Sequence, residues 1–385
     1  MDPEQTRMQR GPAEAAPVGL NTQRTMAPGV PDEAVIAELD AMGLTGAKEI
    51  GRGGFGVVYR ALQPALDRVV AVKVLSSEID VESRERFLRE EQAMGRLSGH
   101  PNIVDILQVD VTETGLPLIV MPYCSRGSLE RLIHDRGPLT WSDTLRAGVK
   151  LAAAIESAHR AGILHRDVKP ANVLISGYGE PQLTDFGIAR IPGGFQTSSS
   201  LITGSPAFTA PEVLKGNEPT VRSDIYGLGA TLFALLTGHA AFERHAGEKV
   251  VAQFLRITTQ NVPDLRAQDI PGDVAEVIER AMSPEPADRP ASAYEFGEML
   301  REVQRAHGQM PDEMALLDSE ETIDDAPEVL KSVTGRRSWP LTLQPAGASV
   351  PMPSSTTGTF PPTAALTQHV EQALAGEGLA RADSP

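Results

Sequence analysis

A short stretch near the middle of the chain, H-R-D-V-K-P-A-N at His165–Asn172, constrains the fold more than any other feature. It places a carboxylate (Asp167), an ammonium group (Lys169) and a carboxamide (Asn172) within one loop. These groups suit a reaction in which the carboxylate orients a hydroxyl for attack on phosphorus, the lysine neutralises the transferred phosphoryl group, and the carboxamide oxygen binds Mg²⁺. An aspartate at a turn has a structural alternative, because it can cap backbone amides. Neighbouring motifs must therefore decide.

A second acidic motif, D-F-G at Asp185–Gly187, follows the run Q-L-T, which we interpret as a strand. Asp185 supplies a charged oxygen, the kind of ligand that Mg²⁺ prefers over nitrogen or sulfur. Three letters alone are a weak signal. Together with Asn172, however, Asp185 predicts a pair of metal ligands.

Glycines form a third motif, G-R-G-G-F-G-V-V, with Gly51, Gly53 and Gly56 between two strand-like runs. Glycine lets backbone amides approach phosphate oxygens without a Cβ atom in the way. A dinucleotide-binding fold would place a helix directly after such glycines, whereas V-V-Y-R-A continues as a strand. The pattern therefore favours a hairpin that covers phosphates.

Lys73 lies in the predicted strand V-A-V-K-V, with apolar residues on both sides. It could be a surface lysine on an edge strand. In a half-buried strand, however, an unpaired ammonium group is costly, so a carboxylate partner is expected. The predicted helix Arg84–Met94 offers Glu90 or Glu91. We favour Glu90, because it shares the apolar face of that helix with Met94.

Along the chain, the glycine motif comes first, followed by the Lys73 strand, the His165–Asn172 loop and D-F-G. This order resembles that of Hanks-type, eukaryotic-like bacterial serine/threonine protein kinases, over about residues 50–308. The resemblance implies an α+β, bilobal protein-kinase fold in a domain at 44–308. Its small β-rich N-lobe, about 44–122, has one main helix, and its larger helical C-lobe covers about 125–308. The implied cofactors are ATP and Mg²⁺, with Mn²⁺ as an alternative metal.

The resemblance also assigns roles to single residues. Asp167 is the implied catalytic base, and Lys169, Lys73 and Glu90 complete the catalytic set, with Asn172 and Asp185 as metal ligands. Lys169 followed by proline is typical of the serine/threonine class. Proteins with Ser or Thr acceptors are therefore the implied substrates.

The implied ATP contacts lie on the glycine-rich hairpin, the next strands and the hinge between the lobes. These residues are Gly51, Arg52, Gly53, Gly54, Phe55, Gly56, Val58, Ala71, Lys73, Met121, Pro122 and Cys124. Pro122 departs from the glutamate usual in the family, and proline has no N–H to donate. The resemblance needs only a carbonyl at Pro122 and an N–H at Cys124, so ATP binding is expected to survive.

Three further positions have structural roles by resemblance. Glu212, in the A-P-E run at Ala210–Glu212, is expected to pair with a buried Arg289. Asp224 is expected to accept hydrogen bonds from the backbone of the catalytic loop, consistent with a place near the N-terminus of a helix.

Arg166, directly before Asp167, suggests control by phosphorylation, although a simple salt bridge is the alternative. The nearby run Q-T-S-S-S-L-I-T-G-S contains Thr197, Ser199 and Thr203 as candidate sites. A phosphate on Thr197 or Ser199 adds close to two negative charges and could order this segment against Arg166.

Both ends of the chain have compositions typical of disorder. Residues 1–31 are rich in Pro, Ala, Gln and Gly, and residues 311–385 are first acidic and then rich in Pro, Ser and Thr. In the acidic part, Thr322 lies in S-E-E-T-I-D-D, similar to motifs that forkhead-associated domains bind as phosphothreonine. A solvated acidic linker is the alternative.

Composition excludes several other classes. The formal net charge of −16 argues against direct nucleic-acid binding. Cys124 is the only cysteine, which excludes an intramolecular disulfide and a cysteine-based zinc cluster. The uncharged run Ile225–Phe242 contains glycines and threonines, so we expect a buried core helix rather than a membrane span. The first residues do not resemble a secretory signal, and a cytoplasmic location is expected.

Three alternatives remain open from the sequence. A small-molecule phosphotransferase of the aminoglycoside type is not expected to carry a segment like Ile188–Glu212, which we interpret as a docking surface for polypeptide. A pseudokinase scaffold usually lacks one of the groups that match Lys73, Asp167, Asn172 and Asp185, and all four are present. Pairing of two kinase domains is neither predicted nor excluded.

Overall fold

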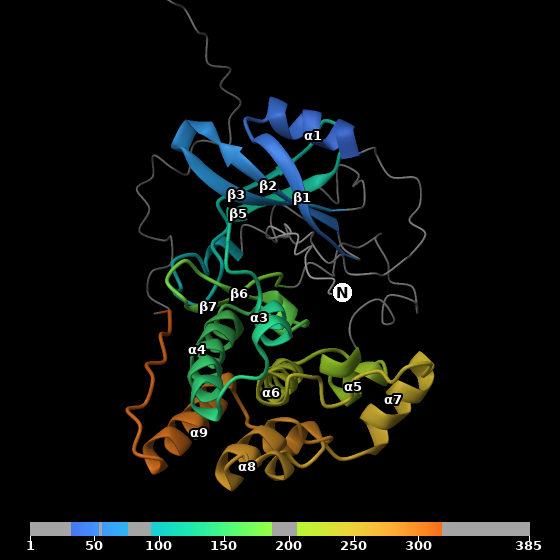
Figure 1. Ribbon diagram of the computed structural model, residues 1–385, viewed down its shortest axis with the longest axis vertical. Helices are drawn as coiled ribbons and strands as arrows, with labels where there is room; N and C mark the ends of the chain where they lie inside the picture. Colours follow the sequence, from blue (N-terminus) through green and yellow to red (C-terminus); the bar gives the residue numbers. More distant parts are fainter. Residues whose placement is uncertain (1–31, 54–55, 76–93, 187–205, 318–385) are drawn as a thin grey trace, which may run out of the picture. The chain divides into compact units, whose positions relative to one another are not determined.

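The computed structural model of the chain describes residues 32–53, 56–75, 94–186 and 206–317. In this part of the chain a sheet-rich N-lobe precedes a helical C-lobe (Figure 1). The α+β, bilobal architecture expected from the sequence is therefore confirmed. The predicted disordered segment 1–31 lies outside the described residues, as does residue 318 onward.

The N-lobe is built on an antiparallel sheet with the strand order β1-β2-β3-β5-β4. Its strands are β1 (Thr45–Gly53), β2 (Gly56–Gln63), β3 (Arg68–Leu75), β4 (Gln108–Val111) and β5 (Pro117–Pro122). The central strand β3 reads R-V-V-A-V-K-V-L and is buried from Val70 onward, as β-branched residues between two strands should be. The predicted glycine hairpin corresponds to β1–β2. The apolar run Val120–Tyr123, which predicts a short buried strand, overlaps the end of β5.

A helix that the sequence analysis missed covers one face of this sheet. Helix α1 (Asp32–Ala41) buries Val35 and Leu39 in a cluster with Tyr59 and Val72 of the sheet. Residues 32–43 lack the strong amphipathic period that marks the later helices, so the pattern gave no signal. The packed N-lobe therefore begins before residue 44, the predicted boundary.

The C-lobe contains most of the helices. Its α-helices are α3 (Leu129–Arg136), α4 (Trp141–Arg160), α5 (Pro211–Leu214), α6 (Val221–Thr237), α7 (Val250–Thr259), α8 (Gly272–Ala281) and α9 (Ala293–Ala306). A short hairpin, β6 (Val173–Ile175) and β7 (Pro181–Leu183), lies beside them. The sequence has two periodic apolar runs, Leu145–His159 and Val274–Met282, which predict helices, and these correspond to α4 and α8.

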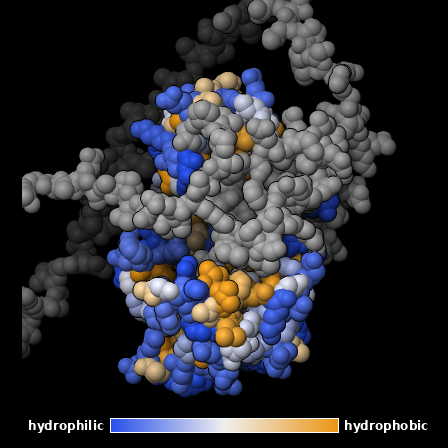
Figure 2. Space-filling model, turned by 90° about the vertical axis from the view of Figure 1, so that its right-hand side faces the viewer, coloured by the Kyte–Doolittle hydropathy of each residue, from blue (hydrophilic) through white to orange (hydrophobic). Residues whose placement is uncertain are grey.

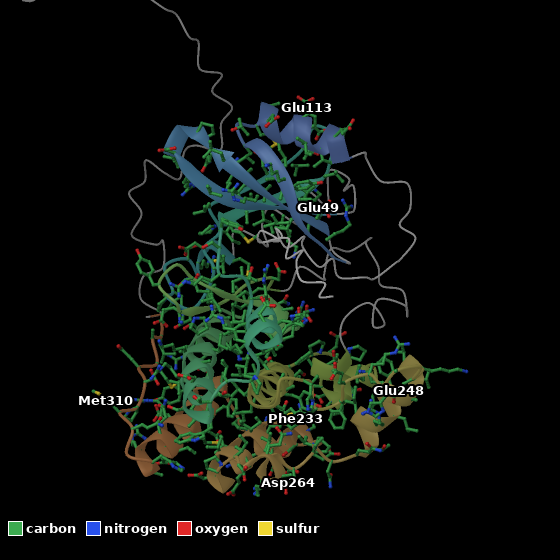
Figure 3. All side chains as sticks on the ribbon, viewed as in Figure 1. Glu49, Glu113, Phe233, Glu248, Asp264 and Met310 are labelled. Atoms are coloured by element: carbon green, nitrogen blue, oxygen red, sulfur yellow. The ribbon has the colours of Figure 1, made fainter. Side chains whose placement is uncertain are left out.

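Helix α6 forms the centre of the C-lobe. Its residue Phe233 lies within the lobe (Figure 3) and is 1% exposed. A Cβ atom at Gly148 of α4 would lie 2.8 Å from side-chain atoms of Leu232 and Leu300, so glycine permits the close packing of α4. The uncharged run Ile225–Phe242 thus lies in a core helix up to Thr237, which confirms the predicted buried helix for that part of the run. None of the helices in the described ranges has the length and apolar character that a membrane crossing requires.

The C-terminal boundary differs from the prediction. The sequence places the end of the kinase domain at Gly308 and the start of a disordered tail at Pro311. In the structure the chain continues in contact with the C-lobe to Leu317, and Met314 and Leu317 pack against the C-lobe core. The acidic composition of the region concealed these two apolar anchors.

Candidate active site

The glycine-rich turn between β1 and β2 borders open space. A Cβ atom added at Gly51 or Gly53 would meet no atom of the described residues within 4 Å. A Cβ atom at Gly56 would lie 2.1 Å from the backbone oxygen of Val74, so only glycine lets β2 pair this closely with β3. Among the described residues, Gly51 and Gly53 thus leave room for a ligand, whereas Gly56 packs closely against β3.

Arg52, in the same turn, contacts Glu49. Its Nη2 atom donates to Glu49 Oε2 at 2.6 Å, and its Nε atom donates to Oε1 at 3.0 Å. Both side chains are exposed, so this ion pair contributes little to stability. The role of Arg52 in ATP binding stays a prediction.

Lys73 of β3 forms an ion pair across the lobes. Its Nζ atom lies 2.8 Å from Oδ1 of Asp185, and the lysine is 6% exposed. A buried ammonium group needs such a partner, as the sequence analysis argued for this position. The contact joins two predicted ATP-site residues. The predicted partner Glu90 lies outside the described residues, so that pairing stays a prediction.

Three of the residues implied as ATP contacts share one apolar cluster. Ala71 and Met121 are buried in it, and Val58 packs against it. Leu174 of β6 packs against the same cluster, and the sequence analysis did not single it out. In β6 the neighbours of Leu174 are buried while Leu174 is half-buried, so Leu174 lies on the opposite face of the strand from them.

The hinge follows β5. Pro122 is the last residue of that strand and pairs with Val70 of β3. Two residues later, Cys124 places its Sγ atom 4.0 Å from the Pro122 carbonyl oxygen. Burial raises the pKa of the Cys124 thiol, so the thiol is neutral at pH 7. These positions fit the predicted hinge.

The catalytic loop holds its three polar groups together. Lys169 Nζ donates to Asp167 Oδ2 at 2.7 Å, and Asn172 Nδ2 donates to the same oxygen at 2.9 Å. Asn172 Nδ2 also donates to the backbone oxygen of Asp167 at 2.9 Å. These contacts use the amide nitrogen and leave the amide oxygen as the candidate ligand atom. They also fix one oxygen of Asp167 on the loop itself.

His165 joins this loop to the strand end that carries Asp185. Its Nδ1 atom accepts from the backbone N–H of Asp167 at 3.3 Å, and its Nε2 atom lies 3.0 Å from the Thr184 carbonyl oxygen. Nε2 must therefore carry the proton that is donated to Thr184. Burial lowers the pKa of His165, although the charges of Asp224, Asp167 and Asp185 oppose this shift. A neutral imidazole thus links the backbone of Asp167 to that of Thr184, which precedes Asp185.

Asp224, in the first turn of α6, supports the backbone of the catalytic loop. Its Oδ2 atom accepts from the N–H of His165 at 2.8 Å, and its Oδ1 atom accepts from that of Arg166 at 2.7 Å. Arg166 has a φ of 69°, a conformation that non-glycine residues adopt only when their surroundings hold it. The predicted contact of Asp224 with this loop is confirmed.

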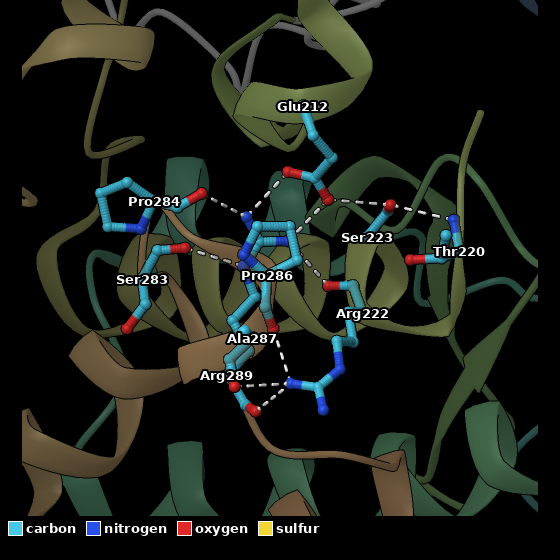
Figure 4. Close-up of polar contacts among 9 residues, drawn as sticks. All are labelled: Glu212, Thr220, Arg222, Ser223, Ser283, Pro284, Pro286, Ala287 and Arg289. Atoms are coloured by element: carbon cyan, nitrogen blue, oxygen red, sulfur yellow. Dashed lines mark hydrogen bonds and ion pairs between the residues drawn. The ribbon is translucent and has the colours of Figure 1, made fainter. Parts of the chain in front are cut away.

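A buried ion pair joins Glu212, at the start of α5, to Arg289 (Figure 4). Arg289 Nη1 donates to Glu212 Oε1 at 2.7 Å, and Nη2 donates to Oε2 at 2.8 Å. Ser223 Oγ adds a hydrogen bond to Oε1 at 3.0 Å. Burial opposes ionisation of Glu212, but the bonds from Arg289 outweigh it, so its pKa lies below the usual value. The predicted pair is confirmed.

Arg222 binds the backbone next to this pair. Nothing in the sequence indicated this contact. Its Nη1 atom donates to the carbonyl oxygens of Pro286, Ala287 and Arg289 at 2.6, 3.0 and 2.6 Å (Figure 4). Its own carbonyl oxygen accepts from Arg289 Nη1 at 3.1 Å. The two arginines therefore fix each other's backbone.

Several predicted site residues lie outside the described residues: Gly54, Phe55, Glu90, Thr197, Ser199, Thr203 and Thr322. Their assignments stay predictions. The remaining candidates in the hairpin, β3, the hinge and the catalytic loop have the contacts given above.

The arrangement can be tested against an ATP–magnesium complex. Mg²⁺ in phosphotransfer sites is usually bound by one or two carboxylates together with phosphate oxygens, rather than by a cage of protein ligands. The described part of the chain contains no group of three His, Cys, Asp or Glu side chains arranged to hold a metal ion. It does offer the Asp185 carboxylate and the Asn172 amide oxygen, and open space beside Gly51 and Gly53. The residues therefore fit a metal that arrives with a nucleotide.

Comparison with known sequences identifies relatives. The protein kinase domain family matches residues 44–301. Serine/threonine-protein kinase PknK of Mycobacterium bovis is 63% identical over 295 residues, which cover 77% of this chain and 26% of the relative. Serine/threonine-protein kinase pkn3 of Myxococcus xanthus is 35% identical over 276 residues, which cover 68% of this chain and 50% of the relative. The chain thus spans about a quarter of the length of its PknK relatives.

A solved structure shares the fold. The kinase domain of Mycobacterium tuberculosis PknI aligns with a TM-score of 0.54 and 30% sequence identity, covering 68% of this chain and 95% of that domain. The family match covers both the sheet that carries Lys73 and the helices around Asp167. With the geometry described above, the conclusion is that this chain belongs to the protein kinase family.

Proposed function

We propose that the protein is a serine/threonine protein kinase, which transfers the γ-phosphoryl group of ATP to Ser and Thr hydroxyls of proteins. The observation that carries this proposal is the contact of His165 with both Asp167 and Thr184. Through it, the candidate base and the candidate metal ligand Asp185 are held in one rigid arrangement. The sequence identity to kinases of the same class supports the choice of acceptor.

Each group then has a defined task. ATP, bound with Mg²⁺ or Mn²⁺, supplies the phosphoryl group and the charge neutralisation that the reaction needs. Asp167 accepts the hydrogen bond, and finally the proton, of the substrate hydroxyl, while Lys169 and Asn172 hold its carboxylate in place. Asn172 and Asp185 would hold the metal, and Lys73 of β3, paired with Asp185, would neutralise phosphate charge. Asp224 keeps the loop backbone fixed during the transfer.

A surface on the C-lobe favours a protein substrate over a small molecule. Apolar side chains gather on the side of the C-lobe where α5 and α7 lie (Figure 2). On α7, Val251 is 76% exposed and Leu255 is 62% exposed. Exposed apolar surface of this kind is typical of sites that contact other macromolecules.

Transfer of labelled phosphate from ATP to a generic basic protein tests the proposal. Asp167→Asn and Lys73→Met should each lower transfer strongly, because each removes one group of the arrangement. Asp135→Asn and Lys215→Met remove the same charges at exposed positions and should retain wild-type activity. Folded wild-type protein that binds ATP but transfers no phosphate, even after incubation with an active relative, would instead favour the pseudokinase scaffold.

Control by autophosphorylation is part of the same proposal. Arg166 has its backbone fixed beside Asp167, and a phosphate on Thr197, Ser199 or Thr203 would bring negative charge toward it. Mass spectrometry after incubation with ATP should find phosphate in this segment. Fully active enzyme without any phosphate between Thr197 and Thr203 would contradict the idea.

The remaining partners are also proposals. Phosphorylated Thr322 is a candidate ligand for a forkhead-associated domain, and its Thr322→Ala variant should then lose capture by such a domain. Pairing of two copies is tested by sedimentation at several concentrations. A cytoplasmic location is tested by fractionation.

A further inference from the structure

A segment beyond the family match is anchored along the C-lobe at several points. Helix α9 ends at Ala306, and the chain turns back at Gly308, whose φ of 68° suits glycine. Residues 309–317, here called the strap, then run beside α4 toward the hairpin of β6 and β7 (Figure 1). The protein kinase family match ends at residue 301, before the strap begins.

The first anchor of the strap is a pair of reciprocal hydrogen bonds. Gln304 of α9, which is 1% exposed, donates from Nε2 to Asp312 Oδ2 at 2.7 Å. The Asp312 backbone N–H donates back to Gln304 Oε1 at 3.0 Å. A buried carboxamide with both ends satisfied fixes the register of the strap.

The second anchor is Met314, whose side chain lies in a notch at Gly297 of α9. A Cβ atom at Gly297 of α9 would lie 2.4 Å from Met314 Cε and 3.2 Å from Ala152 Cβ of α4. A side chain at position 297 would therefore require the end of Met314 to shift. Met310, four residues earlier, projects from the surface with 92% exposure (Figure 3). The two methionines are a natural matched pair.

The third anchor reaches the loop that precedes β4. The carbonyl oxygen of Ala315 accepts from His100 Nε2 at 2.8 Å, across 215 residues of sequence. His100 is 2% exposed, and its Nδ1 atom accepts from the N–H of Asn102 at 3.0 Å. Beyond this, the Leu317 N–H donates to Ser157 Oγ of α4 at 3.2 Å. Both imidazole nitrogens are thus used, one toward the strap and one toward the loop.

From His100, hydrogen bonds continue to the active site. The Leu183 N–H donates to the carbonyl oxygen of Asn102 at 2.9 Å, and the Val104 N–H donates to that of Leu183 at 2.8 Å. Leu183 ends β7, and Asp185 follows two residues later. The contacts form a continuous path from the strap to the strand end that carries the metal ligand.

We propose that the strap, residues 309–317, positions Asp185, and that His100 is the positioning residue through which it acts. The strap braces the loop 100–104, which pairs with Leu183 and thereby fixes the backbone just before Asp185. The inference rests on the proposed kinase function only for its effect on catalysis. Its structural part concerns loop 100–104 and strand β7 alone.

Two variants in the full chain break the path at different points. Met314→Ala empties the notch and loosens the strap. His100→Asn places an amide oxygen where Nδ1 accepts from Asn102, but it is too short to reach Ala315, so only the bond to the strap is lost. Met310→Ala is the matched control, since it removes the same side chain from an exposed position of the strap.

Hydrogen–deuterium exchange without nucleotide is the first readout. Met314→Ala and His100→Asn should each raise exchange in peptides covering residues 100–105 and 181–186 by between about two- and thirtyfold, whereas Met310→Ala should not. The Mg²⁺ concentration for half-maximal ATP turnover should rise in the same two variants. Because Met314→Ala and His100→Asn break one path, their effects should not add in the double variant.

Faster exchange in residues 309–317 of Met314→Ala, with unchanged exchange in residues 100–105 and 181–186, would overturn the proposal. If Met314→Ala does not fold, Ser157→Ala takes its place. It removes the hydrogen bond from the Leu317 N–H to Ser157, and its exchange is compared with that of Met310→Ala in the same peptides. Because exchange requires neither ATP nor turnover, a wild type without activity would defeat the proposed function while the exchange data still decide on the strap.

Discussion

Two ion pairs of the protein, Glu212–Arg289 and Lys73–Asp185, are similar in chemistry but differ in surroundings. Arg289 has a side-chain exposure of 0%, makes a bidentate contact, and donates further to Ser283, Pro284 and Arg222. Among the described residues, Lys73 forms its ion pair with Asp185 at 2.8 Å, and the Asp185 side chain is 28% exposed. The closed pair stabilises the fold, whereas the open pair lies at positions proposed to contact a nucleotide and its metal.

The largest expected effect comes from breaking the closed pair. Arg289→Ala leaves the Glu212 carboxylate buried without its partner and should lower the free energy of unfolding by about 3–5 kcal/mol, measured by urea denaturation. Arg266→Ala, which removes an exposed ion pair with Glu279, is the control and should cost less than ~1 kcal/mol. Equal losses in both variants would contradict the distinction.

Breaking the open pair should affect activity instead of stability. Lys73→Met should reduce kcat/KM for phosphate transfer by roughly 10²–10³-fold, because it removes a charge that faces the phosphates. Its free energy of unfolding should change by less than ~1 kcal/mol, since Asp185 can still be hydrated. A loss of stability as large as that of Arg289→Ala would show that the lysine is a structural residue.

Arg222 offers a smaller test of the closed pair. Arg222→Ala removes the donor shared by three carbonyl oxygens and should cost about 1.5–3 kcal/mol of stability. Because one nitrogen makes all three bonds, Arg222→Lys should retain part of this stability. Thermal unfolding of the two variants beside wild type decides, and a lysine variant no better than alanine would show that the guanidinium geometry is needed.

Lowering the pH should have the smallest of these effects on the free energy of unfolding. The pKa of Glu212 is lowered from its usual 4.5, so the carboxylate ionises more readily in the folded protein than in the unfolded chain. Its contribution is fully present above pH 4.5 and is lost as the pH falls through the lowered value. The free energy of unfolding should therefore fall less steeply below pH 4.5 in Glu212→Gln than in wild type. Parallel curves would contradict this assignment.

How far the sequence predicted the molecule depended on whether a feature repeats locally. The glycine hairpin, β5, α4, α6 and α8 were predicted because their periodic or β-branched runs are visible in short windows. Helix α1 was missed because its ten residues show little periodicity and are held by packing on the sheet. Leu174 was missed because half-burial of one strand residue has no signature in the sequence.

The same division holds at the site. By itself the sequence determined the group Asp167, Lys169 and Asn172, because residues within five positions of one loop must lie close together. Only the tertiary structure decided that Asp185 contacts Lys73, and that Leu317 meets Ser157 across 160 residues. Such contacts depend on how the lobes and helices pack, since local propensity does not fix the distance between remote segments. The motifs thus specify the chemistry, and the packing specifies how its groups are held.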